Sequence, residues 1–254
     1  MVAQTEGDTT TNQGSDTTTV RFGKTKIIIV EDKNNTSVNV DTTVVIKKKP
    51  ESHWAGIELG INMFMNKDSE FDVPSGYEFL ELNEAKSVAV NINFIDKELS
   101  IVNNKLLLVT GLGMTFNNYR FRNNITLLAD TNRVAATYDT ISYEKSKLAI
   151  TYLTVPLLLE FTDGKAKKSF HVAAGIIGGL RIGSHTKQKY QSGSKTVKPK
   201  VRDDFNLSPI RYDATVRFGW GSLALFGTYT LNGLFKDKRG PEIHPFTAGI
   251  GLTF

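Results

Sequence analysis

The 254-residue sequence has no cysteine and no long apolar run. Without cysteine, disulfides, thiolate metal sites and cysteine nucleophiles are excluded. No uninterrupted apolar segment approaches the roughly 20 residues that a transmembrane helix needs, so helical membrane spans are excluded as well. A membrane is still possible, because a transmembrane β-strand crosses in about 9 to 11 residues that alternate between apolar and polar side chains.

The sequence also lacks a strong charge imbalance and a complete secretory signal. The 31 Lys and Arg residues exceed the 26 Asp and Glu residues only slightly and are scattered, so nucleic acid is not an expected partner. Met1 and Val2 are followed at once by a polar stretch, without a basic segment or an apolar segment. We interpret the chain as one whose signal has been removed, and an intracellular protein is the alternative.

Composition divides the chain into three regions. Residues 1–19 are rich in Thr, Asp, Gly, Asn and Gln, which predicts a disordered tail. Residues 20–52 are predicted to form a short β-rich segment, interpreted as a small hairpin outside the main domain. They are too few for a core of their own, so the hairpin would need a partner surface or remain partly mobile. Residues 53–254 are the main domain.

The main domain consists of segments with the period-2 alternation of β-strands. In the last of them Phe246, Ile250 and Leu252 share one face, while threonine and glycine occupy the other. Several segments exceed the usual five or six residues of a soluble strand. Eight are predicted, at residues 53–66, 86–96, 104–118, 147–162, 168–184, 209–220, 222–231 and 245–254.

The connections between these segments are alternately long and short, at about 19, 7, 28, 5, 24, 1 and 13 residues. Outer-membrane barrels show this pattern, with long extracellular loops and short periplasmic turns. The sequence therefore predicts an all-β fold, a transmembrane antiparallel up-and-down β-barrel of about eight strands with a closed lumen. An even strand number puts both barrel ends and the N-terminus on the periplasmic side. A soluble β-sandwich or lipocalin-like carrier is the alternative, and the carrier predicts an apolar interior.

Charged residues fall on the face opposite the apolar one. Facing lipid, each basic side chain would cost roughly 2–4 kcal/mol near the midplane, so this face is predicted to point inward. The predicted lumen network comprises Glu58, Glu160, Arg181, Arg211, Asp213 and Arg217. The two glutamates are expected opposite some of the arginines, without a continuous water channel. For Arg211 and Asp213, a strand end in water is the alternative.

Aromatic residues gather toward the ends of the predicted strands, as an interfacial girdle requires. The predicted girdle residues are Trp54, Tyr119, Trp220, Phe246 and Phe254. Ordinary core aromatics are the alternative. The terminal Phe254 also resembles the signal that barrel-assembly machinery reads, so this machinery is an expected partner during biogenesis.

Residues 185–202 carry six cations and no acidic residue: Lys187, Lys189, Lys195, Lys198, Lys200 and Arg202. On an outward loop these side chains could bind phosphates of outer-membrane lipid or lipopolysaccharide by charge pairing. A merely solvated loop is the alternative.

The middle of the chain holds a recognisable run: Gly111–Gly113, Asn117–Phe121, Tyr143–Leu148 and Tyr152–Glu160. With the His53–Gly56 opening, residues 53–254 resemble the PorT-like outer-membrane β-barrel family of Bacteroidetes. The resemblance implies an outer-membrane barrel, and because the family's namesake takes part in protein secretion, it also implies a secretion or assembly complex as an alternative role. Pro156 deletes a ladder hydrogen bond, so we expect a bulge or a locally widened pairing there.

No catalytic residue, metal site or cofactor is predicted, because phosphate-loop, HExxH and GxSxG patterns are all missing. A lipid-modifying enzyme is the alternative, with Ser184 and His185 or Glu242 and His244 at the outer rim. His53 and His171 are expected to hydrogen-bond near the periplasmic strand ends. The favoured role is a non-enzymatic structural or interaction component of the bacterial envelope, whose loops or N-terminal segment dock a protein partner.

Overall fold

The computed structural model describes residues 15–22, 25–32, 35–41, 52–129, 132–163 and 169–254 of a chain that separates into two units, Met1–Lys49 and Pro50–Phe254. In the first unit, β1 (Ser15–Phe22), β2 (Thr25–Asp32) and β3 (Asn35–Asp41) form a three-stranded antiparallel sheet. The predicted hairpin therefore has a third strand, and the tail boundary at residue 19 is too late. Threonine and valine at positions 17–20 are β-branched and favour this strand. The rest of the predicted tail, residues 1–14, lies outside the described residues.

Eight long strands of the second unit close into an up-and-down barrel. Each pairs antiparallel with the next, and the last pairs with the first. The strands are β4 (Gly56–Asn66), β5 (Val88–Val102), β6 (Leu106–Arg120), β9 (Lys145–Thr162), β10 (Phe170–Ser192), β13 (Ile210–Trp220), β14 (Leu223–Thr230) and β15 (Ile243–Thr253). Every predicted segment overlaps one of these strands, which confirms the predicted fold.

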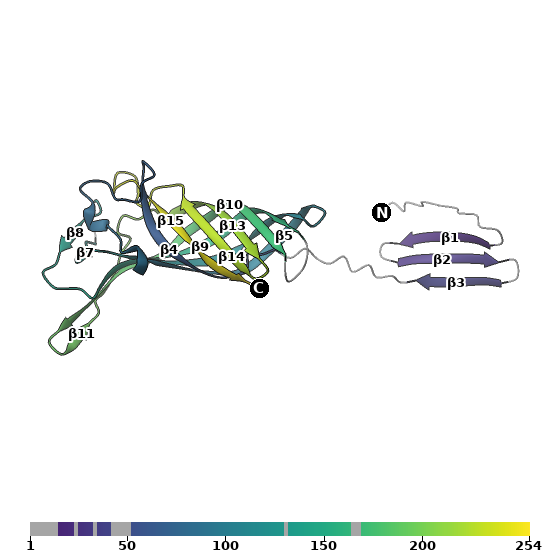
Figure 1. Cartoon of the computed structure of the whole chain (residues 1–254), viewed down its shortest axis with the longest axis horizontal. Helices are drawn as coiled ribbons and strands as arrows, with labels where there is room; N and C mark the ends of the chain where they lie inside the picture. The colour runs from purple at the N-terminus through teal and green to yellow at the C-terminus, as the bar shows by residue number, and fades with distance from the viewer. Residues whose placement is uncertain (1–14, 23–24, 33–34, 42–51, 130–131, 164–168) are drawn as a thin grey trace. The chain divides into compact units, whose positions relative to one another are not determined.

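The connections make the two ends of the barrel different (Figure 1). The short connections β5–β6, β9–β10 and β13–β14 and the C-terminus lie at one end, here called the short-turn end. Four long connections lie at the other, the long-loop end, and carry η1 (Glu78–Leu80), η2 (Glu84–Lys86), β7 (Ile125–Leu127), β8 (Ala136–Tyr138), β11 (Lys195–Val197) and β12 (Lys200–Arg202). None of the described helices is long and apolar enough to cross a membrane.

The alternation along the strands turns apolar side chains outward. On β9 the exposed residues are Val155, Leu157, Leu159 and Phe161, and Thr154 and Glu160, which alternate with them, are buried. The same order holds on β4 and β13, where charged residues point inward. An exposed apolar belt around a polar interior is the opposite of a lipocalin, so the alternative of a soluble carrier is wrong.

Pro156 lies on β9 opposite Ile177 of β10, in regular register. On its other side, the β6–β9 pairing skips from Thr110–Leu157 to Gly113–Thr154. Proline has no N–H to donate there, and the Thr110 hydroxyl instead donates to the Pro156 carbonyl at 2.9 Å. The expected widened pairing is present, and the irregularity of β10 lies elsewhere, between Arg181 and Gly183.

An apolar core fills the barrel at the long-loop end. Strand residues Tyr119, Ile150 and Tyr152 pack there against Leu80, Phe205 and other side chains from all four long connections. Burial of such a cluster favours closure, since apolar area removed from water contributes about 25 cal/mol per Å². The long connections therefore form a packed cap over this end of the barrel.

Candidate functional site

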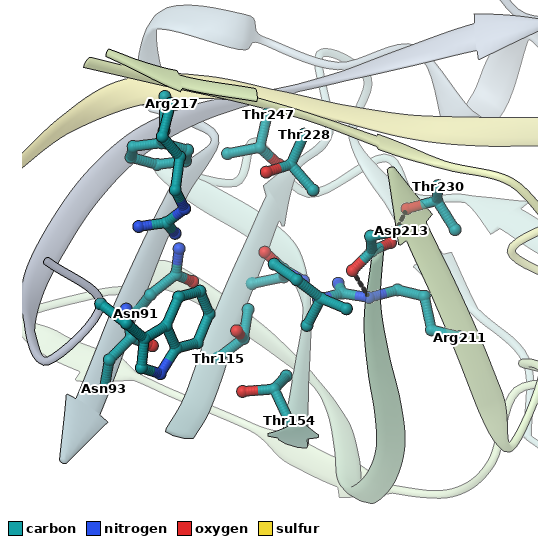
Figure 2. Close-up of a pocket in the computed structure, with 14 residues that line it drawn as sticks. Asn91, Asn93, Thr115, Thr154, Arg211, Asp213, Arg217, Thr228, Thr230 and Thr247 are labelled. Carbon is teal, nitrogen blue, oxygen red and sulfur yellow. Dashed lines mark hydrogen bonds and ion pairs between the residues drawn. The ribbon is translucent and has the colours of Figure 1, made fainter. Parts of the chain in front are cut away.

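The barrel interior below this cap is the candidate functional site. Asparagine, threonine, arginine and aspartate side chains project from the strands into it (Figure 2). The cavity between them measures about 20 Å³, which is space for about one water molecule. An eight-strand barrel leaves room only for side chains, and the described lumen has no passage for a solute.

Glu58 of β4 and Arg217 of β13 form an ion pair inside the lumen, with Oε1 2.5 Å from Nη1. The amide groups of Asn91 and Asn93 donate to the same carboxylate at 2.8 and 3.2 Å. The Arg217 guanidinium lies over the Trp54 ring, 4.5 Å from its centroid. Each charge thus has an ionic partner inside the barrel, as burial of an ion pair requires.

Arg211 and Asp213 form a second pair on the same strand, with Nε 2.8 Å from Oδ2. The Thr230 hydroxyl donates to the other Asp213 oxygen at 2.7 Å (Figure 2), and Arg211 lies 4.2 Å from the centroid of the Tyr152 ring. Both residues are buried, so the alternative that placed them in water at a strand end is wrong. Tyr152 marks the level at which the polar lumen meets the apolar cap.

Glu160 does not face an arginine, and that part of the prediction is wrong. Its carboxylate accepts from His53, whose Nδ1 is 2.6 Å from Oε1 and whose backbone N–H is 3.1 Å from Oε2. His53 stacks on His171, with ring centroids 3.8 Å apart. The alternation predicted the side to which Glu160 points, but its height, near the short-turn end, brings it to the segment that precedes β4.

Residues 52–55, here called the latch, close the short-turn end. The Ser52 hydroxyl and the Ala55 N–H donate to Asp96 at 2.7 and 3.3 Å, and the Phe254 N–H donates to the Ala55 carbonyl at 3.2 Å. Trp54, only 2% exposed, packs inside with Leu107, Val109, Leu158 and Ile177. The lumen is therefore closed at the short-turn end by the latch and at the long-loop end by the cap.

Ser169, His53 and Glu160 are connected like a nucleophile, base and acid. The Ser169 hydroxyl lies 3.1 Å from His53 Nε2, and Nδ1 of the same ring bonds to Glu160. A working triad also needs room for substrate at the nucleophile and donors for an oxyanion. Ser169 is 2% exposed, and none of the described pockets includes it. Through His53 the relay ties the latch to Glu160 of β9 and to Ser169.

Of the five predicted girdle residues, three face outward, as a girdle requires, and two are interior. Trp220 and Phe254 are exposed on the outer surface, and Phe246 shares the outward face and packs against Phe71. Trp54 and Tyr119 are interior, in the latch and in the cap respectively. For Tyr119 the alternation carried the signal, because it lies two residues from the buried Asn117 on β6. Trp54 lies before β4, where no strand alternation applies.

The remaining predicted residues lie at the long-loop end. Arg181 donates to the Ser184 hydroxyl at 2.9 Å and to the Leu207 carbonyl at 3.4 Å, under the cap and apart from the other charges. Ser184 and His185 point to opposite faces of β10, and His244 bonds to the Thr230 carbonyl. The second rim pair is in contact, with His244 Nε2 3.9 Å from Glu242 Oε1, but none of the described hydrogen bonds joins a serine to His185 or His244. The six cations of the basic stretch are distributed over three strands and a connection. Lys187 and Lys189 lie on β10, Lys195 on β11, Lys198 between β11 and β12, and Lys200 and Arg202 on β12.

Comparison with known proteins agrees with this architecture. Residues 17–236 match the family model described as outer membrane protein beta-barrel domain. No curated protein and no solved structure matches the chain.

Proposed function

The chain belongs to the outer membrane protein beta-barrel domain family, and from that membership we propose that it is a non-enzymatic interaction component of a Gram-negative envelope. The barrel is its anchor, and the N-terminal sheet β1–β3 presents the surface that docks an envelope protein. The observation that carries this proposal is the double closure of the lumen by latch and cap. A barrel whose described lumen is closed at both ends, with about 20 Å³ of space between its side chains, is suited to holding a position in the membrane rather than to transport or catalysis through that lumen.

The orientation follows from the asymmetry of the connections. Because long loops of bacterial outer-membrane barrels face outward and short turns face the periplasm, we propose that the latch and the N-terminal residues before it are periplasmic. The absence of native cysteine allows a clean test by single-cysteine labelling. Ser75→Cys in a long connection should react with a membrane-impermeant maleimide on intact cells. Ser222→Cys in the β13–β14 turn should react only after the outer membrane is permeabilised, and the reverse pattern would refute the orientation.

The docking role is tested by crosslinking in native membranes. The full chain and a variant lacking residues 1–49 are compared after detergent extraction. Both should show heat-modifiable migration, because residues 50–254 contain the whole barrel. Only the full chain should retain a crosslinked envelope partner, at the same molar ratio of partner to barrel in each preparation. If neither chain, or both equally, retained a partner, the N-terminal sheet would not be the docking element.

A subunit role in a secretion or assembly complex is the second candidate. The resemblance of the Asn117–Phe121 and Tyr152–Glu160 stretches to PorT-like proteins favours it. Deletion of the gene should then abolish release of proteins to the medium, and complementation should restore it. Normal secretion after deletion would refute the secretion role and leave the interaction role as the proposal.

A further inference from the structure

The outer surface of the long-loop end carries a row of cations in direct cross-strand register. Arg120 of β6 is paired with Lys147 of β9, Lys147 with Lys187 of β10, and Lys187 with Lys200 of β12. Directly opposite residues share a face, with Cβ atoms about 4.5–5.5 Å apart. These four residues, here called the cation row, therefore extend over four neighbouring strands.

Like charges in directly opposite positions destabilise a sheet, and the row contains three successive pairs of this kind. A second tier, Lys145 paired with Lys189, lies beside it. Glu144 forms an ion pair with Lys189, and Lys147 and Arg120 bond only to neutral oxygens, of Asn118 and of the Glu144 backbone. Lys187 and Lys200 form no ion pair with any carboxylate among the described residues. The protein therefore concentrates positive charge here without neutralising it.

The row shares its outward side with the apolar belt. On β10 Ile182 is 52% exposed, and Lys187 follows five residues later on the same strand. At roughly 3.3 Å per residue and a tilt of about 40°, that separation is about 13 Å along the barrel axis. Because Ile182 is the last exposed apolar residue of β10, we infer that the row lies beyond the hydrocarbon edge, at the depth of a headgroup built from sugars.

We propose that the cation row binds the phosphate groups carried on the sugar headgroup of an outer-leaflet glycolipid. The inference rests on the proposed membrane location and outward long loops. Lysine and arginine bind phosphate oxygens by charge-assisted hydrogen bonds, and a line of cations on neighbouring strands matches a headgroup with more than one phosphate. The cost of the like-charge pairs is offset when the anion is bound. The row extends the predicted basic stretch to residues of β6 and β9.

The test uses the full chain in uncharged detergent, with diphosphorylated lipid A as the probe. Wild-type protein should bind this lipid about tenfold or more tightly than lipid A from which both phosphates have been removed. The variant Lys147→Gln/Lys187→Gln should lose about tenfold in affinity. The control Lys97→Gln/Lys105→Gln removes the same charge at the other end of the barrel and should bind like wild type. Equal binding by wild type and row variant, or equal binding of the two lipids, would overturn the proposal.

Two further measurements separate the alternatives. Inorganic phosphate at millimolar concentration should not displace the lipid, and full displacement would indicate a site for free anions instead. Without lipid, the row variant should unfold at the same or a higher temperature than wild type, because repulsion is relieved. A lower midpoint would show that these lysines are structural and would refute the proposal. Heat-modifiable migration of every variant tests the barrel itself, so failure of the site and failure of the membrane assignment are distinguishable.

Discussion

Arg217 and Glu58 meet inside the barrel at 2.5 Å although 159 positions separate them in the sequence. Their side chains are only 4% and 3% exposed. The pair joins β13 to β4, which are separated in the ring by β14 and β15. It thus joins two strands of the wall that are not neighbours.

Removing one partner should be worse than removing both. Glu58→Gln leaves the Arg217 charge buried without a carboxylate, and loss of one member of a buried pair costs about 3–5 kcal/mol. The double variant Glu58→Gln/Arg217→Met should recover much of this loss. Urea unfolding in lipid vesicles measures the difference, and equal stability of the single and double variants would show that the two charges are not coupled.

A basic residue on the outer belt should disturb insertion. Leu157 is 57% exposed and is paired with Ile176, another exposed apolar residue, in the middle of the β9–β10 ladder. Leu157→Arg should destabilise the vesicle-inserted protein by roughly 2–4 kcal/mol. The control Leu128→Arg, in a long connection, should be near neutral. Unfolding midpoints that were equal for the two variants would argue against lipid contact at Leu157.

Ser169 should not act as a nucleophile. The folded protein in vesicles is expected to remain unlabelled by a fluorophosphonate probe, because the hydroxyl is enclosed beside His53. Ser169→Ala is the matched control. Labelling of the wild type that disappears in the variant would show that the relay is reactive and would reopen the enzymatic role.

Acid should loosen the cap at one identified contact. Lys236 and the Asn206 N–H bond to Asp204 and hold the pKa of its carboxyl below the ordinary value of 3.8. A lowered folded-state pKa stabilises the cap above the ordinary value, and this contribution is lost as pH falls through the folded pKa. The protection of cap amides against hydrogen exchange, measured relative to the intrinsic exchange rate at each pH, should therefore fall below about pH 4. Asp204→Asn should exchange fast already at neutral pH, and an unchanged profile would exclude this contact as a tie.

The sequence could predict the barrel because its signals are local and repeated. Strand length, period-2 alternation and alternating connection lengths each follow from crossing a bilayer with tilted strands, and all three agree from β4 to β15. The prediction of inward charges followed from the cost of facing them to lipid. Within a regular strand, the side to which a residue points depends only on whether its position along the strand is odd or even.

The position of a residue along the barrel axis and the identity of its contact partner could not be predicted from the alternation. The partner of Glu160 depends on where the chain enters the barrel, and His53 lies before the first strand, where the alternation no longer applies. Nearness to a strand end predicted Tyr119 in the girdle, although its position in the alternation of β6 places it inside. Trp54, like His53, lies before β4 and carries no such signal. The cap depends on packing between four connections distant in sequence, and no periodic pattern specifies such contacts.

The two tryptophans offer the most direct test of which face is which. Trp220 is 65% exposed on the outside of β13, and Trp54 is 2% exposed in the latch. In vesicles of lipids brominated on the acyl chains, Trp54→Phe leaves Trp220 as the fluorophore, and its emission should be strongly quenched. Trp220→Phe leaves Trp54, whose emission should be almost unaffected. Quenching of Trp54 with sparing of Trp220 would contradict an inside-out barrel with its apolar face toward lipid.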